Sequence, residues 1–252
     1  DFYKDLEKQL NTSFAESLVI KRIFPTINEK EEWKKKQGLP DYKDHLLKID
    51  ASNEEQNHGI VRSGYVVHAE KFYIENQVYF EKTGVLQKET FDDKLFSALE
   101  LSYRGKKYDH VVFCCGYRVS ETPFFKNCQV KPTKGQTLVI KHNELPETAS
   151  LHLKCFVFPM GKKTFRIGAT YEWDDPTLHP TKEARATLLD HLSHITKTPP
   201  EIVSQPVGVR PTTMDRRPVL GSHPTYKTIH VFNGLGAKGY LLAPKMAQEM
   251  VE

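Results

Sequence analysis

The most concentrated chemical signal in the chain is a glycine-rich segment near its C-terminus. Residues 234–239, GLGAKG, have GxGxxG spacing and stand between an expected strand, TIHVFN, and an expected helix. Glycines let the backbone approach a ligand closely, and a helix start presents N–H groups and a positive dipole end. Only 13 residues follow Gly239, too few for the second strand and acidic residue of a dinucleotide fingerprint. The segment predicts a loop that stabilises negative charge, with a structural turn as the alternative.

A second signal is Arg210, in the segment GVRP, which is followed by turn-forming residues up to Gly221. These neighbours predict a short strand with a fixed backbone. The guanidinium group is planar and charged, and it can grip a carboxylate through two parallel hydrogen bonds. Arg210 is therefore a candidate carboxylate anchor. A structural ion pair with Asp215 or another acid is the alternative.

Other reactive side chains give weaker signals. His191 and His194 flank one helical turn beside Asp190, but no third ligand is near, so we expect a solvated helix face and no metal site. No catalytic motif of serine hydrolases, zinc proteases or P-loop proteins occurs. The cysteines have no CxxC spacing and are expected to be reduced core residues; they are Cys114, Cys115, Cys128 and Cys155.

Composition indicates a globular protein. The 252 residues are 38% hydrophobic, and the net charge of +4 is spread without a block of one sign, which favours neither nucleic acid nor an acidic partner. No run reaches the roughly 18 apolar residues of a membrane span. A cytoplasmic location is expected because the cysteines are predicted to be reduced. The acidic start also lacks the features of a signal peptide. The chain opens in an amphipathic helix, and we expect that a segment upstream has been cut away.

Hydrophobic periodicity and breakers predict mixed elements in the first half of the chain. The expected elements are a strand at 18–24, helices at 28–36 and 68–82, a strand or hairpin at 59–67, a strand at 84–89 and a hairpin at 99–115. Residues 43–56 are ambiguous. The run VVFCC within the hairpin predicts a strand buried on both faces in the middle of a sheet.

The second half predicts an antiparallel sheet and two helices. Strands are expected at 136–141, 154–158 and 164–170, with a turn at 160–162, and a helix at 181–195 capped by Thr181. The closing helix should begin near Leu241, because proline at 244 is tolerated in a first turn. Together these elements predict an α/β (α+β) fold with an antiparallel sheet.

Several of these segments carry a family resemblance. GVRPTTMDRRPVLGSHP (208–224) and HVFNGLGAKGYLLAPKMAQEMVE (230–252) resemble the C-terminal signature of the family of D-amino-acid oxidase, glycine oxidase and sarcosine oxidase. YDHVVFCCG, KGQTLVI and TFRIGATYEWDD agree with it in the family's order. The resemblance implies part of a glutathione-reductase-like FAD-binding domain plus an antiparallel substrate domain. It implies boundaries at 1–58 (substrate), 59–117 (FAD), 118–205 (substrate) and 206–252 (FAD).

The resemblance also implies a site. FAD would be held without a covalent bond, since no cysteine follows Cys155, by residues Cys115, Gly116, Gly208, Gly234, Leu235, Gly236, Ala237, Lys238, Gly239 and Tyr240. The substrate would be bound by Arg210, Phe156 and Lys238. Phe156 or Phe158 occupies the neighbourhood of a family tyrosine ahead of Pro159. The implied reaction is hydride transfer from the carbon of an amine or amino acid to flavin N5, without a catalytic protein base.

Family members begin with a strand, a GxGxxG loop and a helix that hold the FAD pyrophosphate, and these elements do not occur ahead of the segments quoted above. The resemblance therefore implies a part of a longer enzyme that is inactive alone. Two other functions stay open. One is a redox-inactive domain that binds carboxylates. The other is a flavoenzyme acting on aminomethyl-modified tRNA, against which the dispersed charge weighs.

Overall fold

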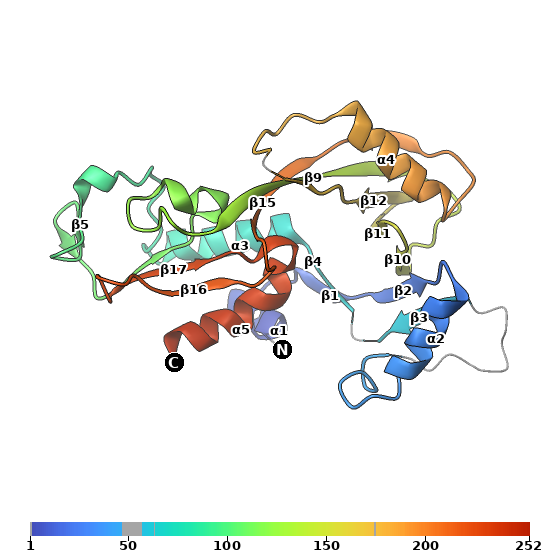
Figure 1. Ribbon diagram of the computed structural model, residues 1–252, viewed down its shortest axis with the longest axis horizontal. Coiled ribbons are helices and arrows are strands. Elements are labelled where there is room, and N and C mark those ends of the chain that lie inside the picture. Colours follow the sequence, from blue (N-terminus) through green and yellow to red (C-terminus); the bar gives the residue numbers. More distant parts are fainter. Residues whose placement is uncertain (1, 47–56, 63, 174) are drawn as a thin grey trace. The chain divides into compact units, whose positions relative to one another are not determined.

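The chain folds into two compact units built from interleaved segments (Figure 1). The computed structural model describes residues 2–46, 57–62, 64–173 and 175–252. Unit 1 comprises Asp1–Val78, Gln136–Thr170 and His179–Val207, and unit 2 comprises Tyr79–Gly135, Tyr171–Leu178 and Gly208–Glu252. The fold is mixed α/β, as expected. The domain boundaries given above stay a prediction, because compact units need not coincide with cofactor and substrate domains.

A mostly antiparallel sheet forms the centre of unit 1. Seven of its strands follow one another in the order β14 (Glu201–Ser204), β9 (Val130–Lys141), β12 (Thr164–Gly168), β11 (Phe156–Gly161), β10 (Ala149–His152), β2 (Val19–Ile23) and β3 (His58–Val61). Strands β13 (Glu172–Trp173) and β15 (Val207–Thr213) also pair with β9. Between neighbours in the order from β14 to β3, β10 and β2 run parallel and the other pairs run antiparallel. The expected strands at 136–141, 154–158 and 164–170 are thus confirmed. The turn is shifted by two residues, because Lys162 and Lys163 adopt the left-handed conformation while β11 continues through Gly161.

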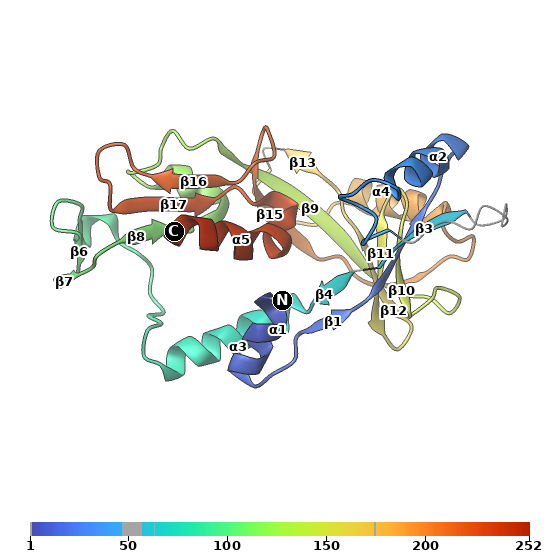
Figure 2. The ribbon, with the colours of Figure 1, turned by 90° about the horizontal axis from the view of Figure 1, so that it is seen from below.

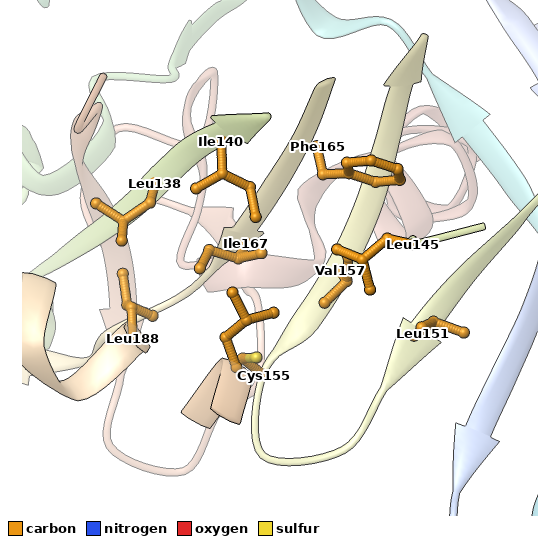
Figure 3. Close-up of a cluster of buried hydrophobic side chains, with 10 residues drawn as sticks. Leu138, Ile140, Leu145, Leu151, Cys155, Val157, Phe165, Ile167 and Leu188 are labelled. Carbon is orange, nitrogen blue, oxygen red and sulfur yellow. The ribbon is translucent and has the colours of Figure 1, made fainter. Parts of the chain in front are cut away.

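The core of unit 1 lies between this sheet and helix α4 (Lys182–Ser193). Alternate residues of β9 and β12 point to one face of the sheet, and Figure 3 shows them facing Leu188 of α4. Thr181 caps the helix as expected, since its Oγ1 accepts a hydrogen bond from the backbone N–H of Ala184 at 3.2 Å. The buried cluster consists of Leu138, Ile140, Leu145, Leu151, Cys155, Val157, Phe165, Ile167, Leu188 and Leu192.

The N-terminal part of unit 1 adds three helices and a small second sheet. The helices are α1 (Phe2–Leu10), α2 (Ile27–Lys36) and α3 (Ala69–Lys82), which confirms all three expected helices, and α3 runs on into unit 2. The sheet pairs β1 (Ala15–Ser17) with β4 (Tyr65–Val67). Residues 59–67 therefore form no hairpin, because β3 pairs with β2 and β4 pairs with β1. Most of the ambiguous segment, residues 47–56, lies outside the described residues.

Helix α1 is amphipathic, but its most deeply buried side chain is an acid. Glu7 is 7% exposed, and its carboxylate accepts hydrogen bonds from the backbone N–H groups of Phe14 and Ala15, both at 2.5 Å. Lys4 pairs with the same carboxylate at 2.8 Å. The hydrogen bond from Lys4, followed by the bond from Ala15, lowers the pKa of Glu7 to about 2. The helix is thus tied to β1 by a charged contact.

Unit 2 contains a three-stranded sheet with helix α5 beside it (Figure 2). Strand β17 (Ile229–Asn233) pairs antiparallel with β16 (Val219–Ser222) and parallel with β8 (Val111–Phe113). A small meander of β5 (Phe96–Ser97), β6 (Ser102–Tyr103) and β7 (Lys106–Lys107) adjoins it in sequence. Two clusters form the core: Leu101, Phe113 and Ile229, and Val119, Val130 and Val231.

The structure corrects several expectations in unit 2. No strand forms at 84–89, and the expected hairpin shrinks to β6 and β7 around Arg104 and Gly105, both with positive φ. Strand β8 pairs with β17 instead. Within the described residues β8 is an edge strand, with Phe113 4% exposed but Val112 44% exposed. Its side chains alternate between a packed and an open face, so its burial on both faces was wrongly predicted.

Two further corrections concern cysteines and the closing helix. All four cysteines are free thiols, but only Cys155 is buried, whereas Cys114 and Cys115 are exposed and Cys128 is half-buried. Helix α5 (Gly239–Val251) begins two residues before the expected start and contains Pro244 in its interior. Proline at this position cannot donate the helical hydrogen bond to the carbonyl of residue 240.

Candidate functional site

Arg210 lies in a narrow slot of unit 2. It belongs to β15 (Val207–Thr213), which pairs with β9. A Cβ atom at Gly135 of β9 would overlap the guanidinium group of Arg210, so only glycine leaves the slot open. On the other side, Cζ of Arg210 lies 5.5 Å from the centroid of the Tyr171 ring, a cation–π distance. The guanidinium is thus held between a glycine backbone and an aromatic ring.

Arg210 keeps its positive charge in this environment. Burial lowers the pKa of Arg210 while Tyr171 opposes the shift, and an arginine stays protonated in either case. The alternative partner, Asp215, accepts a hydrogen bond from the backbone N–H of Arg217 at 3.0 Å, which lowers the pKa of Asp215. Asp215 therefore serves the turn after β15.

The glycine loop requires glycine at two positions. Gly234 and Gly236 have φ angles of 72° and 53°, in the left-handed region. A Cβ atom at Gly234 would also lie 3.0 Å from Cγ2 of Thr213 and 3.1 Å from the backbone nitrogen of Val219. A short 3₁₀ turn, Gly236–Lys238, then leads into α5, and Lys238 precedes the helix without a side-chain cap.

Asn233 ties this loop to the end of β8. Its Nδ2 donates to the carbonyl oxygen of Gly116 at 2.8 Å, and its Oδ1 accepts from the backbone N–H of Gly234 at 2.8 Å. The side chain is 3% exposed. The glycine turn at 116, with φ of 60°, and the C-terminal glycine loop are therefore held together. Sequence reasoning missed Asn233, although a polar residue closing the apolar strand TIHVFN was the available signal.

The residues around the loop fit a polar, anionic group. In the part of the chain that the structure describes, Thr212 Oγ1 is buried without a hydrogen-bond partner. It lies 3.7 Å from the position that a Cβ atom would occupy on Gly236. A buried hydroxyl without a partner carries an energetic penalty of about 1–3 kcal/mol, which a bound ligand would remove. The donor set combines this hydroxyl, a glycine backbone and the start of a helix.

The other expected site residues are distributed as follows. Gly208 is exposed and a Cβ there would meet open space, and Ala237, Lys238 and Tyr240 are exposed at the start of α5. Cys115 is exposed at the end of β8, directly before Gly116. Phe156 belongs to unit 1, where Cζ of its ring would lie 3.0 Å from a Cβ on Gly168. Unit 2 alone thus brings together the loop, Gly116 and Arg210.

Two other expectations concern features outside this site. His194 contacts Nζ of Lys154 at 2.9 Å, and the described residues contain no group of three metal-ligating side chains. Across the described part of the chain, no helix combines the length and apolar character needed to cross a membrane.

Two solved structures with a similar fold are described as oxidases. The glycine oxidase from Geobacillus kaustophilus superposes with a TM-score of 0.80 at 18% identity, covering 99% of this chain and 74% of that one. The iminodiacetate oxidase from Chelativorans sp. BNC1 gives 0.77 at 15% identity, covering 98% and 76%. At these identities the likeness establishes the fold, which is that of FAD-dependent oxidases.

Two sequence relatives are more similar in sequence but much longer. Glycine oxidase of Bacillus subtilis is 29% identical over 177 residues, which are 66% of this chain and 46% of that protein. The tRNA 5-methylaminomethyl-2-thiouridine biosynthesis bifunctional protein of Idiomarina loihiensis is 28% identical over 125 residues, 47% of this chain and 20% of that protein. The matched part thus spans about half the length of the glycine oxidase and a fifth of the length of the bifunctional protein.

The family described as FAD dependent oxidoreductase, DAO, matches residues 29–252, nearly the whole chain. This match confirms the resemblance found in the C-terminal motifs and the expected FAD cofactor. The chain belongs to the DAO family of FAD-dependent oxidoreductases.

Proposed function

We propose that this chain supplies the substrate anchor and the flavin-ring loop of an enzyme that oxidises an amino acid or a related amine bearing a carboxylate. The observation that carries the proposal is the placement of the Arg210 guanidinium between Gly135 and Tyr171. A preorganised arginine binds a carboxylate through two charge-assisted hydrogen bonds with little loss of side-chain entropy.

The proposed roles follow from the local chemistry. Bound FAD supplies a two-electron acceptor for the hydride on the substrate α-carbon. Arg210 binds the carboxylate and thereby fixes the position of that carbon. The glycine loop and the start of α5 present N–H groups to negative charge on the cofactor, and Thr212 offers a hydroxyl. The positioning of the substrate is then the main contribution of the protein, and no side chain acts as a base.

The remaining contacts complete the proposal. Cys115 and Gly116 would adjoin the cofactor at the end of β8, together with Gly208, Leu235, Ala237, Gly239 and Tyr240. Phe156 and Lys238 would contact the substrate. A phenylalanine offers no hydroxyl to a carboxylate, so Arg210 would carry most of the recognition, and the binding of the substrate should depend strongly on that one residue.

The test compares the full-length protein with the 252-residue chain. Both are purified in parallel and denatured, and the released cofactor is identified by its absorbance and mass. We expect the full-length protein to release FAD and the shorter chain to release little, with oxidation of amino acids confined to the former. If the full-length protein releases no flavin, the proposed function is wrong.

A redox-inactive carboxylate-binding domain would behave differently. Calorimetry with a panel of amino acids on flavin-free full-length protein separates the two, because a binding domain without a redox role should keep its affinity when FAD is removed. Retained affinity combined with no oxidation by the FAD-loaded protein would favour the binding domain.

The relative from Idiomarina loihiensis favours a second candidate, oxidation of an aminomethyl group on a tRNA base. RNA binding depends on phosphate contacts and weakens steeply with salt. A gel shift with tRNA that is absent, or that does not respond to salt, would remove this candidate. A salt-sensitive shift together with flavin reduction by the modified tRNA would replace the amino acid with this substrate.

A further inference from the structure

An ion pair between a buried lysine and a half-buried aspartate stands directly beside the Arg210 slot. Lys134 is 1% exposed, and its Nζ donates to Oδ2 of Asp175 at 2.8 Å and to Oγ1 of Thr177 at 3.0 Å. Oδ1 of Asp175 accepts the backbone N–H of Thr177 at 2.8 Å. Burying an ammonium group is unfavourable unless it is paired and fully hydrogen-bonded, so this clasp, defined as Lys134, Asp175 and Thr177, is a specific contact.

The clasp attaches a short segment of unit 2 to β9. This segment is residues 171–178, one of the three stretches of chain that make up unit 2, and it contains Asp175 and Thr177. Its regular pairing is limited to the two-residue strand β13 (Glu172–Trp173), which pairs with Lys134 and Thr133 of β9. Two residues of ladder are a weak attachment. The charged contacts of Lys134 therefore add substantially to this attachment.

The clasp is linked by register to both walls of the slot. Glu172 pairs with Lys134, so Tyr171 precedes one member of that pair and Gly135 follows the other. Gly135 and Tyr171 are the two groups between which the guanidinium of Arg210 lies. A shift of the 171–178 segment along β9 would carry the tyrosine ring away from the guanidinium, since side-chain direction in a strand depends on register.

Tyr171 cannot hold this position by burial, because 43% of its surface is exposed. Its ring packs edge-on against Trp173 with centroids 5.4 Å apart, and Trp173 is 39% exposed and lies in the same short segment. The aromatic wall of the slot is therefore only as fixed as the segment that carries it.

We propose that Lys134 and Asp175 are positioning residues, which hold Tyr171 against Arg210 and so orient the guanidinium for the carboxylate of the substrate. This inference rests on the proposed function of Arg210 as the carboxylate anchor. The hydrogen bond from Lys134, with the bonds from Thr177, lowers the pKa of Asp175 to about 2. The carboxylate of Asp175 thus stays ionised at neutral pH.

The experiment measures acetate binding by calorimetry on the FAD-loaded full-length protein, with acetamide as the uncharged probe. Asp175→Asn keeps the shape of the side chain but removes its charge, and Lys134→Met is the second variant. The matched control is Glu201→Gln. It breaks a solvent-exposed ion pair, 3.2 Å long, between Glu201 of β14 and Lys141 at the other end of β9. The affinity for FAD and the melting temperature are recorded for each variant.

We expect Arg210→Met to weaken acetate binding by roughly 100-fold, the loss of a charge-assisted bidentate contact. Asp175→Asn should weaken it by roughly tenfold, without changing the affinity for FAD. In the Arg210→Met background, Asp175→Asn should have no further effect, because the clasp acts through the arginine. Glu201→Gln should bind acetate as the unaltered protein does.

The outcomes separate the two proposals. If Arg210→Met weakens acetate binding but Asp175→Asn and Lys134→Met do not, the positioning role is wrong and the anchor stands. An equal loss from Asp175→Asn with and without Arg210 also overturns the positioning role, since it indicates general destabilisation. If the unaltered protein binds no acetate, or Arg210→Met binds it equally well, the anchor itself fails and the positioning role fails with it.

Discussion

Strand β9 buries two different kinds of side chain along its length. Its C-terminal half places Leu138 and Ile140, both 0% exposed, in the apolar core of unit 1. Its N-terminal half buries Thr133 and Lys134 in unit 2, next to Gly135. Apolar burial stabilises in proportion to the area removed from water, whereas polar burial gains little unless each group is paired. The C-terminal half of β9 therefore contributes to the stability of unit 1, whereas the N-terminal half positions the proposed site in unit 2.

The largest expected effect is in the apolar half. Leu188→Ala removes a fully buried side chain that packs on Leu138 and Ile167. The free energy of unfolding should fall by about 2–5 kcal/mol, since a cavity adds to the lost transfer energy. Urea denaturation measures this change. Val203→Ala on β14, with 51% of the residue exposed, is the control and should stay within about 0.5 kcal/mol of the parent. Equal losses in both variants would contradict the assigned core.

The next effect is in the polar half. Gly135→Ala places a methyl group where the guanidinium of Arg210 lies. Overpacking of this kind typically destabilises by about 1–3 kcal/mol, and displacement of the guanidinium should weaken acetate binding at least as much as Asp175→Asn does. Calorimetry and urea denaturation report the two quantities. Gly38→Ala, where the nearest heavy atom is 3.7 Å away, is the control. Unchanged acetate affinity in Gly135→Ala would mean that the slot is not the binding site.

A smaller effect is expected at the loop. Asn233→Ala removes two hydrogen bonds of 2.8 Å that join Gly116 and Gly234. Leaving these buried backbone groups without partners should lower stability by about 1–3 kcal/mol. The affinity for FAD should fall more than that for acetate, as measured by flavin fluorescence on reconstitution. A variant with normal affinity for FAD would show that the loop needs no such tie.

These comparisons also explain what could be predicted from the sequence. Helix α4 and its cap Thr181 depend on periodicity and on one hydrogen bond three residues away, and both are local properties. The glycine loop was found from its GxGxxG spacing between an expected strand and an expected helix, and the positive φ angles of Gly234 and Gly236 explain why glycines stand there. The partner of β8 is β17, more than a hundred residues away, so local alternation could not reveal that pairing. The burial of Lys134 could not be predicted either. Lysine is rarely buried unless it is paired, and its partner Asp175 lies 41 residues further along the chain.

The smallest effect concerns acid stability. The pKa of Glu7 is lowered to about 2 by its hydrogen bonds with Lys4 and Ala15. A carboxylate whose pKa is lower in the folded state stabilises the fold above its unfolded pKa, about 4.3, and loses this contribution as the pH falls towards 2. Stability should therefore decline between about pH 5 and pH 2, and Glu7→Gln should flatten that decline. Glu32→Gln, which removes an exposed ion pair with Lys35, should leave the decline unchanged.

Anaerobic reduction of the flavin in the full-length protein by a panel of amino acids tests the role of Arg210 most sharply. We expect at least one amino acid to bleach the visible absorbance of the flavin. Arg210→Met should need roughly 100-fold more of that amino acid to reach the same rate, because it loses a charge-assisted carboxylate contact. If Arg210→Met is reduced at the same concentrations as the parent, or if no amino acid bleaches the flavin, Arg210 is not the anchor of an amino-acid oxidase.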